Sequence, residues 1–294
     1  MDIEKLPPIV IDPKTFLREH CTLPALPEVV QEVQGIIQSE DVEIAKVSQA
    51  ISRDPALVAQ ILKVVNSAYY SLPREIADVR YAIAFLGLHE IERIVLALSV
   101  INTLAVPDKN ELKLFWHHSF LAALCTKHLA SQYEPRLSFE ELWSAAMLHD
   151  IGKLVYLKFF PDHYKAIRKI SAERGIFFSD VERDLKLPAS GYFGVLLCDH
   201  WRLPAKIRDA CEAHSLQDLQ AIKTGDAAGR FKRMICLGNA VGMLSLNSLN
   251  EVKKTEIARG IQTALKCDET RFLTLMAEVY DLRMQAEGFM EQFG

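Results

Sequence analysis

The sequence AMLHDIGKL at residues 146–154 places a histidine directly before an aspartate, at the end of a run of apolar residues. Such a run predicts a buried helix with His149 and Asp150 at its C-terminal end. Neutral imidazole nitrogen and carboxylate oxygen are both ligands of divalent metals, and both can reach one ion from a helix end. The stretch therefore predicts a metal site. The competing interpretation is a chance His–Asp pair whose histidine is hydrogen-bonded within the core.

Residues on either side of this pair extend the predicted site. His118 lies on a long helix predicted earlier in the chain and is expected to face the core. A metal held by His118, His149 and Asp150 would keep open positions for a water molecule or a phosphoryl oxygen. Lys153 follows one turn later and is expected to neutralise phosphate charge, so Asp150 and Lys153 are the catalytic candidates if the site is active. Gly152, between them, is expected to loosen the backbone.

Further outward the dominant hydrophobic period is helical, and no stretch requires a strand. Asp54 before Pro55 predicts a helix start, Gly87 predicts a helix end, and Ser138 begins a capping-box sequence. The apolar spacing predicts helices over residues 27–37, 55–65, 79–86, 91–101, 111–132, 139–150, 161–173, 189–201, 204–214 and 229–246, and two more between 250 and 292 that separate near 267. The predicted fold class is all-α.

Several motifs in a fixed order carry a resemblance to a known family. They are LPALP at 23–27, ISRDPAL at 51–57, ILKVVNSAYY at 61–70, AIAFLG at 82–87, AMLHDIGKL at 146–154 and WRLP at 201–204. Together they resemble the HDOD domain, the HD-related output domain of bacterial signalling proteins. This domain is a degenerate relative of the HD and HD-GYP metal-dependent phosphohydrolases. The resemblance implies a multi-helical fold, with an HD phosphodiesterase-like C-terminal half after an N-terminal helical subdomain.

The resemblance also implies a ligand set that can be compared position by position. His118 matches the first histidine of an HD enzyme better than His117, and the His-Asp pair is His149 and Asp150. Asn239 stands where a final metal-binding aspartate is expected, and a neutral amide oxygen is a weaker ligand than a carboxylate. The implied set is His118, His149, Asp150 and Asn239, for at most one divalent ion (Fe, Mn, Zn, Ni or Mg).

A second metal is not implied. Relatives that cleave cyclic dinucleotides carry extra histidines, and the equivalents in this chain are Ser190 and Ser215. Serine hydroxyls rarely serve as metal ligands, so the resemblance implies a degenerate site.

The same motifs suggest a division of the chain into four parts. Residues 1–20 form an N-terminal segment, 21–106 the N-terminal helical half of the HDOD domain, and 107–246 the HD-like half. Residues 247–294 are expected to form C-terminal helices that pack on the domain or on a partner.

Composition restricts the partners. The net charge of -4 argues against a nucleic-acid surface, and the arginines and lysines of the first half are interspersed with acids. No apolar run is long enough to span a bilayer, and the charged start MDIEK does not resemble a signal peptide. Six scattered cysteines without a C-x-x-C pair are typical of reduced, buried thiols. We expect a cytoplasmic protein.

Two functions follow from these observations. The first is a non-catalytic signalling module that binds a protein partner or a small ligand. The second is a residual metal-dependent phosphohydrolase acting on a nucleotide or a phosphodiester. The sequence leaves the partner, the ligand and the oligomeric state open.

Overall fold

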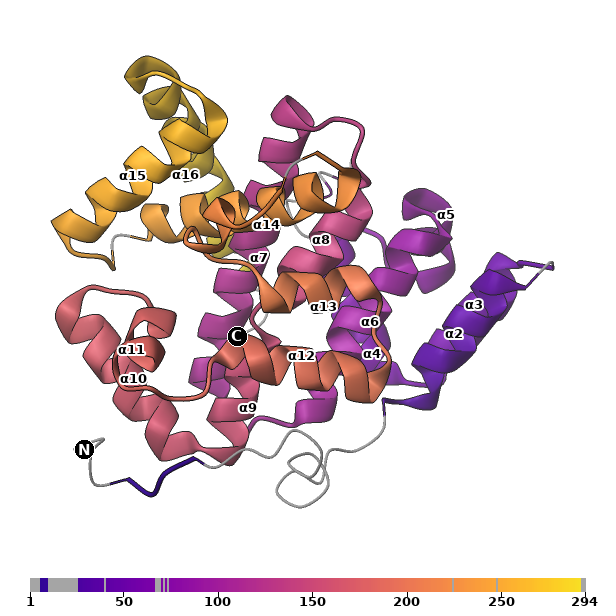
Figure 1. Ribbon diagram of the computed structural model, residues 1–294. Coiled ribbons are helices and arrows are strands. Elements are labelled where there is room, and N and C mark those ends of the chain that lie inside the picture. The colour runs from indigo at the N-terminus through magenta and orange to yellow at the C-terminus, as the bar shows by residue number, and fades with distance from the viewer. Residues whose placement is uncertain are drawn as a thin grey trace. The chain divides into compact units, whose positions relative to one another are not determined.

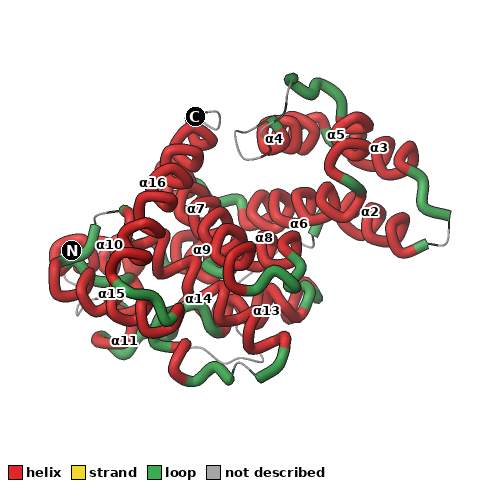
Figure 2. The backbone as a smooth tube through the Cα atoms, turned by 90° about the horizontal axis from the view of Figure 1, so that it is seen from above, coloured by secondary structure: helices red, strands yellow, loops and turns green. Residues whose placement is uncertain are grey.

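The computed structural model of the chain describes residues 6–9, 26–39, 41–66, 70, 72, 74–223, 225–246 and 248–291. Every regular element among these residues is a helix and none is a strand (Figure 2), so the all-α prediction is confirmed. Leu23 to Ala25 of the LPALP motif and residues 67–69 lie outside the described residues, as does most of the predicted segment 1–20.

The chain divides into two compact units. Unit 1 comprises the described residues of Met1–Thr22 and Val106–Met284, and unit 2 those of Leu23–Ala105 and Gln285–Gly294. The predicted four-part division into residues 1–20, 21–106, 107–246 and 247–294 remains a prediction.

The described residues of Leu23–Ala105 in unit 2 form helices around an aliphatic core. They are α2 (Glu28–Gln38), α3 (Ile44–Ser52), α4 (Pro55–Val65), α5 (Val79–Leu86) and α6 (Leu88–Leu104). Ile51, Ile61 and Ile83 are fully buried in this core. Helix α3, of nine residues, was not predicted from the sequence.

Local signals in unit 2 explain where its helices begin and end. Asp54 Oδ1 accepts hydrogen bonds from the backbone N–H groups of Ala56 and Leu57, both at 3.0 Å, and Pro55 is the first helical residue. Gly87 separates α5 from α6 with a φ of +88°, which L side chains rarely adopt. Both predicted boundaries are confirmed.

Unit 1 contains the remaining helices (Figure 1). They are α7 (Lys109–Tyr133), α8 (Phe139–Leu148), α9 (Ile151–Phe159), α10 (Pro161–Arg174), α11 (Phe178–Asp184), α12 (Ser190–Trp201), α13 (Ala205–Glu212), the 3₁₀ turn η3 (Asp218–Gln220), α14 (Ala227–Ser245), α15 (Glu251–Leu265) and α16 (Glu269–Glu291), the last of which ends in unit 2. Helices α7, α8 and α14 pack against one another, and α12 packs against α9 and α13.

Two glycines permit the close helix contacts that position the centre of unit 1. A Cβ atom on Gly238 of α14 would lie 2.0 Å from Thr126 Oγ1 of α7, and one on Gly152 of α9 would lie 1.8 Å from the backbone oxygen of Ser190. Gly152 is in the first turn of α9. The expectation that it loosens the backbone is therefore wrong, because it instead lets α9 approach α12. Neither α9 nor α11 was predicted from the sequence.

Candidate metal centre and its pocket

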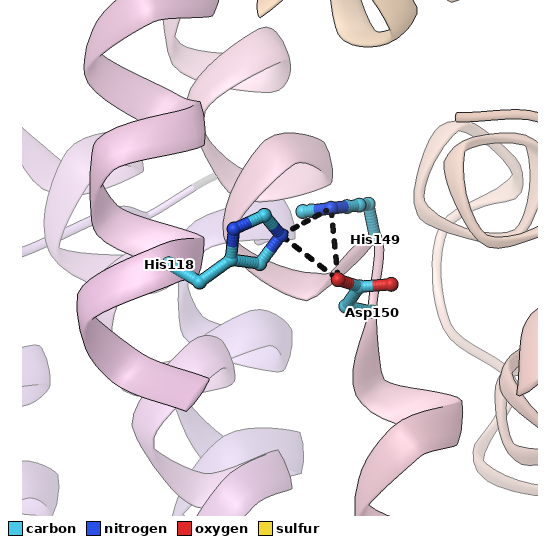
Figure 3. Close-up of side chains that lie close together, drawn as sticks. All are labelled: His118, His149 and Asp150. Atoms are coloured by element: carbon cyan, nitrogen blue, oxygen red, sulfur yellow. Dashed lines mark hydrogen bonds and ion pairs between the residues drawn. The ribbon is translucent and has the colours of Figure 1, made fainter. Parts of the chain in front are cut away.

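Three predicted ligands meet at the junction of α8 and α9. His149 is the C-terminal cap of α8, Asp150 is the N-terminal cap of α9, and His118 projects from α7 toward both (Figure 3). His118 Nε2 lies 2.9 Å from Asp150 Oδ2 and 3.3 Å from His149 Nε2, and His149 Nε2 lies 3.3 Å from Asp150 Oδ2. One ligand atom from each residue falls within 4.8 Å of the other two.

His214 is a fourth residue at the centre, and sequence reasoning assigned it no role. It follows α13, and its Nε2 lies 3.3 Å from Asp150 Oδ1, the carboxylate oxygen that faces away from His118 and His149. Its ring centroid is 5.0 Å from that of His149. In the sequence, His214 stands out only by its position directly before Ser215. That position is not enough to place it at the centre, because its approach to Asp150 depends on the packing of α13 on α8.

Hydrogen bonds fix where the protons of two of these imidazoles lie. His149 Nδ1 donates to the backbone oxygen of Ala146 at 2.6 Å, which leaves His149 Nε2 facing Asp150. His214 Nδ1 donates to the backbone oxygens of Ala210 and Cys211, at 3.1 and 3.2 Å, so His214 Nε2 carries a lone pair. The lone pair of His214 faces the carboxylate of Asp150.

Burial sets the charge states of the centre. Burial lowers the pKa of His118 to about 4, although Asp150 opposes the shift, and burial also lowers the pKa of His214. Burial alone would raise the pKa of Asp150, but the ammonium of Lys153, the imidazole of His149 and the hydrogen bond from His118 hold it well below its usual range. At neutral pH His118 and His214 are neutral and the carboxylate is ionised, which are the states that bind metals.

These residues fit a divalent cation. The Nε2 atom of His214 and the Oδ1 atom of Asp150 are both acceptors, and they face each other at 3.3 Å without a proton between them. Asp150 Oδ1 makes no hydrogen bond with any residue that the structure describes. A cation near this carboxylate would remove the repulsion, and imidazole with carboxylate suits Zn²⁺, Fe²⁺, Ni²⁺ or Mn²⁺.

The other predicted ligands have partners of their own. Asn239 of α14 donates through Nδ2 to the backbone oxygen of His214 at 2.9 Å, while its Oδ1 is buried without a hydrogen bond. The Ser215 hydroxyl donates to Asp218 at 2.6 Å. Ser190 is buried at the start of α12, where its backbone N–H donates to Glu182 at 2.9 Å. Asn239 thus holds His214 in place, and Ser215 is engaged elsewhere.

The centre lies at the wall of a pocket of about 490 Å³ within unit 1. His118, Asp150, His214 and Asn239 line it, together with the charged groups of Lys153 and Arg168. Most of the remaining wall is apolar or aromatic and includes Phe115, Phe177, Phe178, Ile176 and Met243. Among the described residues, Asp150 is the only carboxylate that lines this pocket. Its size and mixed lining suit a small organic molecule.

Sequence comparison identifies a family and one distant relative. The HDOD domain matches residues 23–216. An uncharacterized protein of Treponema pallidum is 24% identical over 192 residues, which make up 65% of this chain and 37% of that protein. The chain therefore spans little more than a third of the length of this relative.

Structure comparison supports the same fold. An HDOD domain protein of unknown function from Geobacter sulfurreducens matches with a TM-score of 0.71 at 21% identity, over 94% of this chain and 96% of that one. A candidate phosphohydrolase from Shewanella amazonensis matches at 0.68 and 22%, over 95% and 98%. A candidate signal transduction protein from Marinobacter aquaeolei matches at 0.69 and 18%, over 99% and 63%.

The lengths and hydropathy of the helices test the prediction that no segment spans a bilayer. None of those in the described part of the chain has both the length and the apolar character that crossing a bilayer requires.

Proposed function

We propose that this chain, which belongs to the HDOD domain family, is a non-catalytic regulatory module of bacterial signal transduction that binds its ligand in the pocket beside Asp150. The observation that carries the proposal is the donor set of that pocket. It holds one carboxylate, and the position expected to supply a second holds Asn239. A neutral amide at that position is a weaker ligand and compensates the charge of a catalytic cation less than a carboxylate would.

The proposal includes one divalent ion at the centre. His118, His149 and Asp150 would hold it, and His214 faces the free oxygen of the same carboxylate. Asn239 then acts through His214, whose backbone oxygen it binds. Such an ion would give the pocket a positive charge to which an anionic ligand or an acidic partner segment could bind.

Residual phosphohydrolase activity is the second candidate function. The convergence of His118, His149 and Asp150 at the wall of a pocket that also contains Lys153 and Arg168 favours it. In that case a bound divalent ion would lower the pKa of a coordinated water and polarise a phosphoryl oxygen. Asp150 would hold the ion, and Lys153 would contact the phosphate.

The wider context is proposed on the same basis. A signalling protein is the expected partner, the cytoplasm the expected location, and nucleic acid and membrane are not expected ligands. The oligomeric state stays open. The C-terminal helices of residues 247–294 offer apolar side chains for docking on the domain or between chains, and Leu273, Tyr280 and Met284 of α16 are exposed.

The experiment that tests the proposal measures metal content and turnover together. Purified wild-type protein, His149→Ala and the control His128→Ala are analysed for bound Fe, Mn, Zn and Ni. The same preparations are assayed against nucleotides and phosphodiesters with added Mn²⁺ or Ni²⁺. We expect metal in the wild type and in His128→Ala, its loss in His149→Ala, and no turnover in any of them. Metal-dependent turnover that disappears in His149→Ala would establish the phosphohydrolase instead.

A further inference from the structure

The ammonium group of Lys153 contacts the carboxylate at the centre. Its Nζ atom lies 2.5 Å from Asp150 Oδ2, the oxygen that also faces the Nε2 atoms of His118 and His149. The Asp150 side chain is 1% exposed and that of Lys153 is 24% exposed. The ammonium is therefore the charge that compensates the carboxylate at its interface with the pocket.

An ammonium and a divalent ion repel each other when both contact this oxygen. Two positive charges within about 4 Å repel each other by several kcal/mol at the effective dielectric constant of a partly buried site. A carboxylate oxygen that already accepts from Lys153 and His118 has little room for a further ligand bond. Metal binding between His118, His149 and Asp150 Oδ2 thus requires the ammonium to move away.

Phe178 offers the ammonium a contact that does not involve Asp150. Lys153 and Phe178 both line the pocket, and Lys153 Nζ already lies 5.7 Å from the centre of the Phe178 ring, within range of a cation–π contact. The lysine side chain has four flexible carbons, so a short rotation can move the ammonium away from Asp150 and toward this ring. Apart from Asp150, no carboxylate of the described residues lines the pocket to compensate the displaced charge.

We propose that Lys153 is a resident cation of this centre, and that its displacement by a divalent ion creates an anion site in the pocket. A divalent ion and a tetrahedral anion, such as a phosphate group, then bind cooperatively. The ammonium neutralises Asp150 when the ion is absent and faces the anion when the ion is present, with Arg168 as a second cation in the same pocket. This inference rests on the metal site of the proposed function and adds its regulation.

The test is a titration of Mn²⁺ by calorimetry, with and without sulfate as the tetrahedral anion, on wild type and Lys153→Met. Without sulfate we expect Lys153→Met to bind Mn²⁺ at least about tenfold more tightly, because a repelling charge is removed. Sulfate should tighten Mn²⁺ binding in the wild type, and Mn²⁺ should tighten sulfate binding by the same factor. Lys153→Met should lose this coupling.

Two further variants control the result. Lys158→Met removes a cation from the same helix, outside the pocket lining, and should behave as wild type. Lys153→Gln repeats the loss of charge with a polar side chain, should Lys153→Met fail to fold. Equal or weaker Mn²⁺ binding in the Lys153 variants, or no sulfate effect in the wild type, overturns the inference while the metal site stands. Absence of Mn²⁺ binding in every protein overturns both. Turnover, measured separately, bears only on the non-catalytic role.

Discussion

Helix α7 carries two histidine–carboxylate pairs that are alike in geometry and different in surroundings. His118 Nε2 lies 2.9 Å from Asp150 Oδ2, and His128 Nε2 lies 2.8 Å from Glu278 Oε2. The Asp150 side chain is 1% exposed, whereas that of Glu278 is 32% exposed. The same two chemical groups therefore occur once in the core and once at the surface.

The difference lies in what surrounds each carboxylate. Glu278 also accepts from Gln132 at 3.2 Å and from Arg271 at 3.3 Å, so donors satisfy it on several sides. Asp150 faces a lone pair on His214, and Lys153 is the one ammonium or guanidinium group within ion-pair distance of it among the described residues. The protein's own donors satisfy the carboxylate of the surface pair. The carboxylate of the buried pair would be stabilised by a bound cation. This need for a cation, rather than the His–carboxylate contact, marks a candidate metal site.

The largest effect is expected from Asp150→Asn. The amide keeps the shape of the side chain but removes the charge that attracts a cation. We expect metal affinity to fall by more than about a hundredfold, beyond the losses typical of changes outside the ligand shell. A competition titration with a chromophoric chelator measures this. The matched variant Glu278→Gln should retain wild-type affinity, and a similar loss in both proteins would remove the distinction between the two pairs.

The next largest effect is expected from acidification of the metal-free protein, which changes its stability through buried groups at and near the centre. The pKa of His118 falls from 6.5 to about 4 on folding, so the unfolded chain binds the extra proton and stability is lost as pH drops from 6.5 to 4. Burial raises the pKa of Glu182 from 4.5 to about 7, so the folded chain binds that proton and stability falls as pH rises from 4.5 to 7. The two contributions oppose each other, and His214, whose pKa burial also lowers, adds to that of His118.

Glu182→Gln should therefore reveal the contribution of the centre. The glutamine side chain is isosteric with the acid and has an oxygen that can accept from Ser190 N–H, but it does not titrate. Between pH 7 and 4.5 we expect this variant to lose as much as about 3 kcal/mol more stability than the wild type, because the offsetting contribution of Glu182 is gone. Urea unfolding in the presence of a chelator measures it. Parallel pH profiles for the two proteins would mean that Glu182 is not protonated near neutral pH.

A smaller effect is expected from moving the backbone that carries Asp150. A Cβ atom in Gly152→Ala would lie 1.8 Å from Ser190 O and 2.6 Å from the nitrogen of Gly194, so α9 must shift away from α12. We expect a cost of about 2 kcal/mol in unfolding free energy. Gly35→Ala in α2 meets nothing within 4 Å and should instead gain about 0.5–1 kcal/mol from helix propensity. Calorimetric unfolding of both variants distinguishes a steric contact from a general glycine effect.

Much of the fold could be predicted from the sequence because helical periodicity and capping residues are local signals. The capping boundaries at Asp54 and Gly87 depend on neighbours within four residues, and the structure contains both. Helices α3, α9 and α11 were missed. Helix α11 has seven residues and α9 nine, and α9 follows α8 with only His149 and Asp150 between them, so its apolar residues continue the apolar run of α8 along the sequence.

The candidate site was only partly predictable, since its geometry depends on contacts between helices. The meeting of His118 with His149 and Asp150 was expected, and the structure places them together, although metal binding at these residues remains a prediction. His214 and the contact of Lys153 with Asp150 could not be predicted. They depend on how α13 packs on α8 and on which way a flexible ammonium turns, and neither leaves a periodic signal.

The smallest effect is expected from a double-mutant cycle on the surface pair, with His128→Ala, Glu278→Ala and both together. Exposed ion pairs contribute about 0.2–1 kcal/mol, and Glu278 keeps Arg271 and Gln132 when His128 is removed. We expect a coupling energy below about 1 kcal/mol that added Mn²⁺ leaves unchanged. The equivalent cycle on His118 and Asp150, followed by urea unfolding, should show coupling that grows with Mn²⁺, because the ion binds the folded state through both residues. If Mn²⁺ changed the surface coupling as much as the buried one, burial would not be what distinguishes the two pairs.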